Sequence, residues 1–209
     1  IKGFENTMEL ARIVRYVDST TGNIYDTFID TLDERRITNT TIPKIQEAYF
    51  TDLGKNIILR YLDNDNQTIE SYVATLPEEI IGGDNEGTLS GTFLDKNIFD
   101  MKISPDTKNI FYMSKSSAGV IGMLLNAKAE NEKQVFSSPC TGWKAEFVNS
   151  KMISLATKAS GRFDGYLYSL NPTTNAFEKI LDGGKGFMGK VSPNGKKVIF
   201  DLKSESGAV

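Results

Sequence analysis

Apolar and polar residues form short runs along the chain, separated by clusters of turn-forming residues. The segment that begins near Trp143 is representative: KAEFV, MISLATK, GYLYSL and FEKIL are joined by NSK, ASGRFD and NPTTNA. Short runs rich in Ile, Val, Tyr and Phe between Asn, Pro, Gly, Asp and Ser are typical of β-hairpins and meanders. Only NTMELARIV at 6–14 also admits a helix, in competition with a strand. The pattern therefore predicts an all-β chain.

This pattern of strands and turns repeats along the chain. RYVD at 15–18 recurs as RYLD at 60–63, an offset of 45 residues. One turn of each unit is followed by a lysine, with spacings of 53, 43 and 45 residues, at Lys55, Lys108, Lys151 and Lys196. The longest spacing contains an extra segment, roughly 82–96, so the underlying unit has about 44 residues. A period of this length indicates a repeat architecture.

The turn before each lysine has a recurring sequence. SPDTKNIFY at 104–112 matches SPNGKKVIF at 192–200, and TDLGKNIIL at 51–59 is a weaker copy. Proline pre-sets φ for such a turn, Asp or Asn can cap it, and Gly can take a positive φ. Thr107 stands where the other copies have Gly, so we expect that turn to differ slightly.

Four antiparallel strands in about 44 residues is the geometry of a β-propeller blade. We expect the second strand of each blade to be the most uniformly apolar, because blades stack on both of its faces. The chain is predicted to be a single β-propeller domain, or part of one, incomplete at the chain ends. A fragment of a larger ring is favoured, and a closed five-bladed ring is the alternative. The expected blades are a partial blade 1 at about 10–43, blade 2 at 44–96, blade 3 at 97–142, blade 4 at 143–185 and a partial blade 5 at 186–209.

The turn and strand at 104–112 and 192–200 resemble the S-P-D-G-K-x-[IL]-x-[FY] signature of the TolB-type, WD-repeat-like bacterial β-propeller family. YLYSLNPTTNAFEKIL also resembles that family's third strand, turn and fourth strand. The signature is one of fold, and it occurs in scaffolds, translocation components and the propeller domains of prolyl oligopeptidase-like peptidases. The resemblance implies an extracytoplasmic location, whether periplasmic, secreted or surface-anchored.

Composition and charge limit the kinds of binding and catalysis expected of the chain. The formal net charge is −3 with a pI near 5.2, which argues against nucleic-acid binding, since phosphates need a concentrated basic face. No apolar run is long enough to span a membrane.

The chain has no histidine, and its one cysteine, Cys140, is expected to be a packed or loop thiol. The GxSxG motif is absent, and DNDNQTIE at 63–70 fits a solvated loop better than a calcium loop. We therefore predict no catalytic residue, metal or cofactor.

Surface loops remain as the candidate site. The loops after each second strand and between blades should gather on one face, including 137–143, 159–164 and the 82–96 insertion. Trp143, Arg162 and Phe163 are residue types favoured at binding hot spots, and they are the candidate binding residues. For Trp143, packing between blades competes with exposed contact and is favoured, whereas for Phe163 the two are balanced.

The favoured function is a non-enzymatic binding or scaffold module that recognises a protein, peptide or cell-envelope ligand through its loop face. The propeller domain of a larger hydrolase (a peptidase or a glycosidase) is one alternative. A structural component of a surface assembly is the other, and the oligomeric state is left open.

Overall fold

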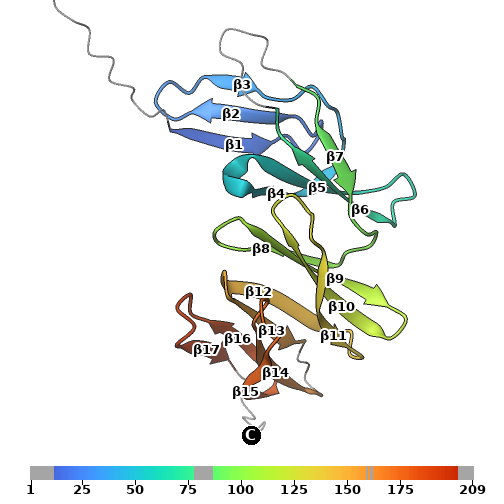
Figure 1. Ribbon diagram of the computed structural model, residues 1–209, viewed down its shortest axis with the longest axis vertical. Helices are drawn as coiled ribbons and strands as arrows, with labels where there is room; N and C mark the ends of the chain where they lie inside the picture. The colour runs from blue at the N-terminus through green and yellow to red at the C-terminus, as the bar shows by residue number, and fades with distance from the viewer. Residues whose placement is uncertain (1–11, 78–86, 159, 161, 202–209) are drawn as a thin grey trace, which may run out of the picture.

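The structure is a computed structural model, and it describes residues 12–77, 87–158, 160 and 162–201. In this part of the chain nearly all regular structure is β-strand, and the one helix is a short 3₁₀ turn, η1 (Asp52–Gly54). The strands form five antiparallel sheets that follow one another in chain order (Figure 1). Only the end of the ambiguous 6–14 segment is described, and Ile13 and Val14 lie in a strand there.

Each sheet is built from strands that are consecutive in sequence. Sheet 1 has β1 (Ile13–Val17), β2 (Ile24–Phe28) and β3 (Glu34–Arg36). Sheet 2 has β4 (Ile45–Thr51), β5 (Asn56–Leu62), β6 (Ile69–Thr75) and β7 (Ser90–Phe93). Sheet 3 has β8 (Asp100–Ile103), β9 (Asn109–Ser116), β10 (Gly119–Asn126) and β11 (Lys133–Ser138). Sheet 4 has β12 (Trp143–Asn149), β13 (Met152–Thr157), β14 (Asp164–Leu170) and β15 (Phe177–Lys185). Sheet 5 has β16 (Met188–Val191) and β17 (Val198–Asp201).

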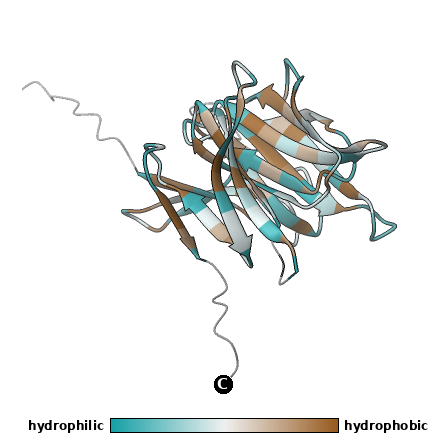
Figure 2. Cartoon of the chain, turned by 90° about the horizontal axis from the view of Figure 1, so that it is seen from below, coloured by the Kyte–Doolittle hydropathy of each residue, from teal (hydrophilic) through white to brown (hydrophobic). Residues whose placement is uncertain are grey.

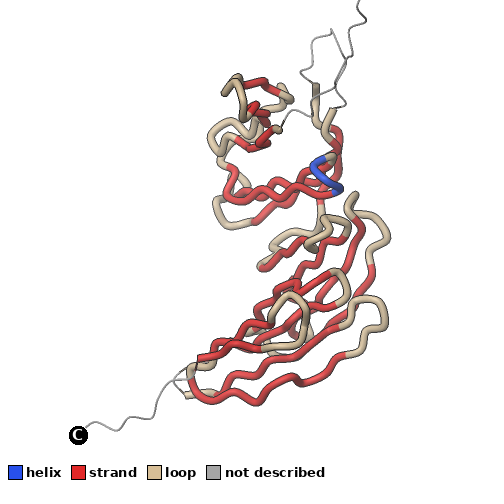
Figure 3. The backbone as a smooth tube through the Cα atoms, turned by 90° about the vertical axis from the view of Figure 1, so that its left-hand side faces the viewer, coloured by secondary structure: helices blue, strands red, loops and turns tan. Residues whose placement is uncertain are grey.

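The hydrophobic core is divided among the interfaces between successive sheets. Ile24 of sheet 1 and Ile57 of sheet 2 share one cluster, and Ile58 packs with Tyr112 of sheet 3. Phe111, on the other face of sheet 3, packs with sheet 4. Neighbouring residues of one strand thus belong to different clusters, because successive side chains point to opposite faces of a sheet. Figure 2 shows the apolar residues gathered within the strands, and Figure 3 shows the sheets following each other along the molecule.

The expected burial of each second strand is confirmed in three sheets. The central residues of β5, β9 and β13 are buried. In β17, by contrast, Ile199 is 76% and Phe200 51% exposed. Sheet 5 has two strands and one neighbouring sheet in the described part of the chain, so its apolar side chains have fewer partners.

The turn at Thr107 corrects an expectation. It has the same hydrogen bonds as the glycine turn: the Thr107 N–H donates to the Ser104 carbonyl and the Gly195 N–H to the Ser192 carbonyl, both at 2.8 Å. Thr107 takes a φ of 59°, near the 71° of Gly195, although a positive φ is strained for a β-branched residue. Its carbonyl accepts the Asp52 N–H at 2.8 Å and its hydroxyl accepts the Leu53 N–H at 2.9 Å. These bonds from sheet 2 offset the strain.

The 82–96 segment also differs from expectation, because its described part is not simply an inserted loop. Residues 82–86 lie outside the described residues. Beyond them, Gly87 forms a parallel bridge with Thr38, and Ser90–Phe93 is β7, the fourth strand of sheet 2. The segment supplies a strand, since its backbone pairs with β6 and not with solvent.

Two arginines connect the first three sheets. The side chain of Asp26 is fully buried and accepts two hydrogen bonds from Arg15, at 2.6 and 2.7 Å, while Arg35 lies 3.4 Å away. Arg15 also donates to the Gly54 carbonyl of sheet 2 at 2.8 Å. Arg60, 45 residues later, is 6% exposed and donates to Glu47 and to the Ile98 carbonyl beside sheet 3. Sheets 1 and 2 therefore each use an arginine on one strand to hold the following sheet.

Candidate functional site

The exposed candidate residues lie in the loop between β13 and β14. Ser160 organises this loop: its hydroxyl accepts the N–H groups of Arg162 and Phe163, both at 3.1 Å. The Ser160 N–H donates to the Phe163 carbonyl at 3.3 Å, and its carbonyl accepts the Gly186 N–H at 3.0 Å. The loop is thereby closed on itself and tied to the segment that precedes β16. Its apolar tip is on the surface, since Phe163 is 73% exposed.

The segment between β11 and β12 lies beside this loop. The Lys158 N–H, just after β13, donates to the Gly142 carbonyl, just before β12, at 2.7 Å. Cys140 is exposed in this segment, and its N–H bonds the Ser138 hydroxyl at 3.1 Å. Segment 138–142 and residues 158, 160, 162 and 163 therefore lie at the same end of sheet 4, and we call them together the loop face. Sequence spacing gave no signal for the bond that joins them.

Trp143 lies beneath the loop face and not on it. Its side chain is at the interface of sheets 3 and 4 and is 6% exposed. Its ring centroid lies 5.2 Å from that of Phe136, 5.6 Å from Tyr168 and 6.4 Å from Phe177. The geometry with all three is edge-to-face, which is favourable for aromatic pairs. This burial matches the packing interpretation of Trp143, and the structure does not place its indole at the surface beside Phe163.

The loop face carries positive charge. Lys158 and Arg162 are exposed, and neither forms an ion pair within the described residues. Asp164 is exposed beside them at the start of β14. The face thus combines two cations with the apolar surface of Phe163, an arrangement suited to a ligand that has acidic groups next to apolar ones.

Asp65 and Tyr112, elsewhere in the described part of the chain, have local structural roles. Asp65, in the loop between β5 and β6, accepts bonds from the Thr68 hydroxyl and from the Thr68 and Gln67 N–H groups. These bonds lower the pKa of Asp65 to about 2. Tyr112 is buried and bonds Glu132, and burial together with that carboxylate raises the pKa of its phenol. In the described chain no three acidic or thiol side chains converge on a metal-sized site.

Comparison with solved structures identifies the fold. The sequence matches no family model and no curated protein. Among solved structures, the β-propeller domain of the trilobed protease from Pyrococcus furiosus has a TM-score of 0.58 at 14% identity, covering 93% of this chain and 60% of that one. TolB from Acinetobacter baumannii has a TM-score of 0.53 at 13% identity, covering 94% and 48%. An oligogalacturonate lyase in complex with manganese has a TM-score of 0.60 at 12% identity, covering 92% and 56%.

Identities of 12–14% show the fold alone, and the chain spans only 48–60% of the length of these three proteins. The fold predicted from the repeat is confirmed. The four-stranded antiparallel sheets are propeller blades, and the chain has a β-propeller fold that resembles the TolB type.

Proposed function

We propose that this chain is a non-enzymatic, extracytoplasmic binding module that recognises a protein, peptide or cell-envelope ligand through its loop face. The observation that carries the proposal is the loop of Arg162 and Phe163, which is held by Ser160 and Gly186 while its apolar tip stays exposed. A pre-organised loop loses little conformational entropy on binding, so an exposed aromatic and an arginine there favour recognition. Trp143 supports the face from below by anchoring the start of β12.

The domain organisation is part of this proposal. Sheets 1 to 5 are the blades of a single propeller domain, with boundaries near residues 44, 97, 143 and 186. The proposed location follows the resemblance to TolB structures. In the part of the chain that is described, no helix has the length and apolarity needed to traverse a bilayer.

Capture from cell-envelope extracts tests the loop face. The double variant Arg162→Ala/Phe163→Ala should lose most of the ligand that the wild-type chain retains. Leu53→Ala is the matched control, because Leu53 is 83% exposed but lies in the β4–β5 turn, at the opposite end of the strands. Equal capture by wild type and double variant would contradict the proposal.

The neighbours favour a second candidate, the propeller domain of a larger enzyme. They include the propeller domain of a protease, a putative dipeptidyl aminopeptidase and a lyase, and this chain spans 60%, 33% and 56% of those chains. The complete reading frame discriminates between the two candidates: a hydrolase domain with a GxSxG motif encoded next to this chain would support the enzyme, and its absence would remove that version.

A further inference from the structure

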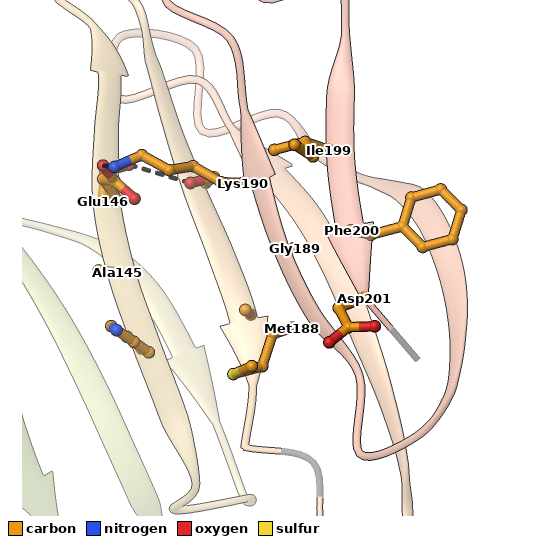
Figure 4. Close-up of a pocket in the computed structure, with 11 residues that line it drawn as sticks. Ala145, Glu146, Met188, Gly189, Lys190, Ile199, Phe200 and Asp201 are labelled. Atoms are coloured by element: carbon orange, nitrogen blue, oxygen red, sulfur yellow. Dashed lines mark hydrogen bonds and ion pairs between the residues drawn. The ribbon is translucent and has the colours of Figure 1, made fainter. Parts of the chain in front are cut away.

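A groove separates sheet 4 from sheet 5. Its volume is about 500 Å³, within the range of small-molecule sites. One wall comes from β12 and β13 and the other from the β16–β17 hairpin (Figure 4). The residues that matter here are Lys144, Ser154 and Ala156 on the first wall and Met188, Ile199 and Asp201 on the second.

The repeat explains why the groove exists. In sheets 2 to 4 the positions three and five residues after the turn lysine lie on the second strand, on the face toward the next sheet. In sheets 2 and 3 they hold large side chains that fill the interface: Ile58 and Arg60, then Phe111 and Met113. In sheet 4 the same positions hold Ser154 and Ala156. Small residues at positions that are otherwise large leave a space that the opposite hairpin does not fill.

The groove also contains unpaired charge. Lys190 of β16 reaches across to Glu146 of β12, with 2.7 Å between the ammonium nitrogen and the carboxylate oxygen (Figure 4). The Ser154 hydroxyl donates to the Glu146 carbonyl at 3.3 Å. Lys144 and Asp201 have no ion-pair partner within the described residues, and they stand on opposite walls. One cation and one anion are therefore available to a ligand.

The remaining surface of the groove is apolar. Met188 is 68% exposed and points from the hairpin toward β12, whereas the ring of Phe200 points away (Figure 4). Ile199, at 76% exposure, and Ala156 add apolar surface on the two walls. A ligand that covered Met188 and Ile199 would remove this apolar area from water, which stabilises the complex.

We propose that this groove binds a small zwitterion with an apolar body, such as a short apolar peptide with both ends free. The ligand carboxylate pairs with Lys144, its ammonium group pairs with Asp201, and its side chains cover Met188 and Ile199. The groove shares no residue with the loop face.

Calorimetric titration with three dipeptides tests the assignment. Leucyl-leucine should bind saturably, at least tenfold more tightly than N-acetyl-leucyl-leucine, which lacks the cation, or leucyl-leucinamide, which lacks the anion. Lys144→Met should abolish the preference over the amide, and Asp201→Asn the preference over the acetylated peptide. Lys151→Met, which removes an exposed lysine from the β12–β13 turn, should leave all three affinities unchanged.

Refilling the groove provides a second test. Ser154→Ile copies the residue of sheet 2, and Ala156→Met copies that of sheet 3. Each variant should abolish binding of leucyl-leucine while its circular dichroism spectrum stays that of the wild type. Two variants are used so that the test still stands if one of them misfolds. Absence of saturable binding by the wild type, equal affinity for all three dipeptides, or full binding by a folded refilled variant would each overturn the proposal.

Discussion

Removing Arg15 from its ion pair with the buried Asp26 should strongly destabilise the fold, and the effect can be compared with that of removing one partner of an exposed pair nearby. Asp26 is fully buried, and Arg15 is its main partner through two short hydrogen bonds. In Arg15→Met the carboxylate would keep only Arg35, 3.4 Å away, and the link to the Gly54 carbonyl would also be lost.

The expected size of the effect follows from burial. Removing one partner of a fully buried pair typically costs about 3–5 kcal/mol, because an uncompensated charge remains. The Arg15 side chain is 25% exposed and Arg35 still contacts Asp26, so we expect Arg15→Met to lower the free energy of unfolding by about 2–4 kcal/mol. Arg15→Lys keeps the charge but not the planar fork, so about 1–2 kcal/mol is expected.

Arg12 provides the matched control. Its contact with Asp30 measures 3.7 Å, with the two side chains 76% and 65% exposed. Arg12→Met should therefore change the free energy of unfolding by no more than about 0.5 kcal/mol. Urea denaturation followed by circular dichroism measures all three variants. If Arg15→Met proves no more destabilising than Arg12→Met, the structural role assigned to the buried pair is wrong.

Three further predictions concern single side chains. The thiol of Cys140 is exposed, so a maleimide should label it fully in the native state; labelling that requires urea would contradict its position. Trp143 is 6% exposed in an aromatic cluster, so its fluorescence should resist acrylamide quenching until the chain unfolds, and Trp143→Ala should destabilise the fold by about 3–5 kcal/mol. The Thr68 and Gln67 bonds lower the pKa of Asp65 from 3.8 to about 2, so the stabilisation they provide is present above pH 4 and is lost as the pH falls toward 2. The difference in stability between wild type and Asp65→Ala should therefore shrink over that range, and a constant difference would contradict it.

The candidate site was only partly predictable from the sequence. The residue types at Arg162 and Phe163 identified their loop as a candidate binding surface, and the structure places both residues on the surface. The same reasoning favoured burial of Trp143, but it could not identify the packing partners Phe136, Tyr168 and Phe177, which come from neighbouring strands and sheets. The groove was missed as well, although a comparison of repeat positions would have revealed that Ser154 and Ala156 stand where the other sheets have large residues.

The sequence by itself determined most of the strands, the turns and the repeat, because these depend on local properties: alternation of apolar residues, the fixed φ of proline and the side-chain bonds of Ser, Asp and Asn. Tertiary structure decided what involves residues distant in the chain. Thr107 holds a glycine-like φ because Leu53, 54 residues away, bonds its hydroxyl. Likewise β7 is a strand because β6 pairs with it. Hydrogen bonds and packing between sheets join segments whose proximity no local pattern encodes, and they settled these positions.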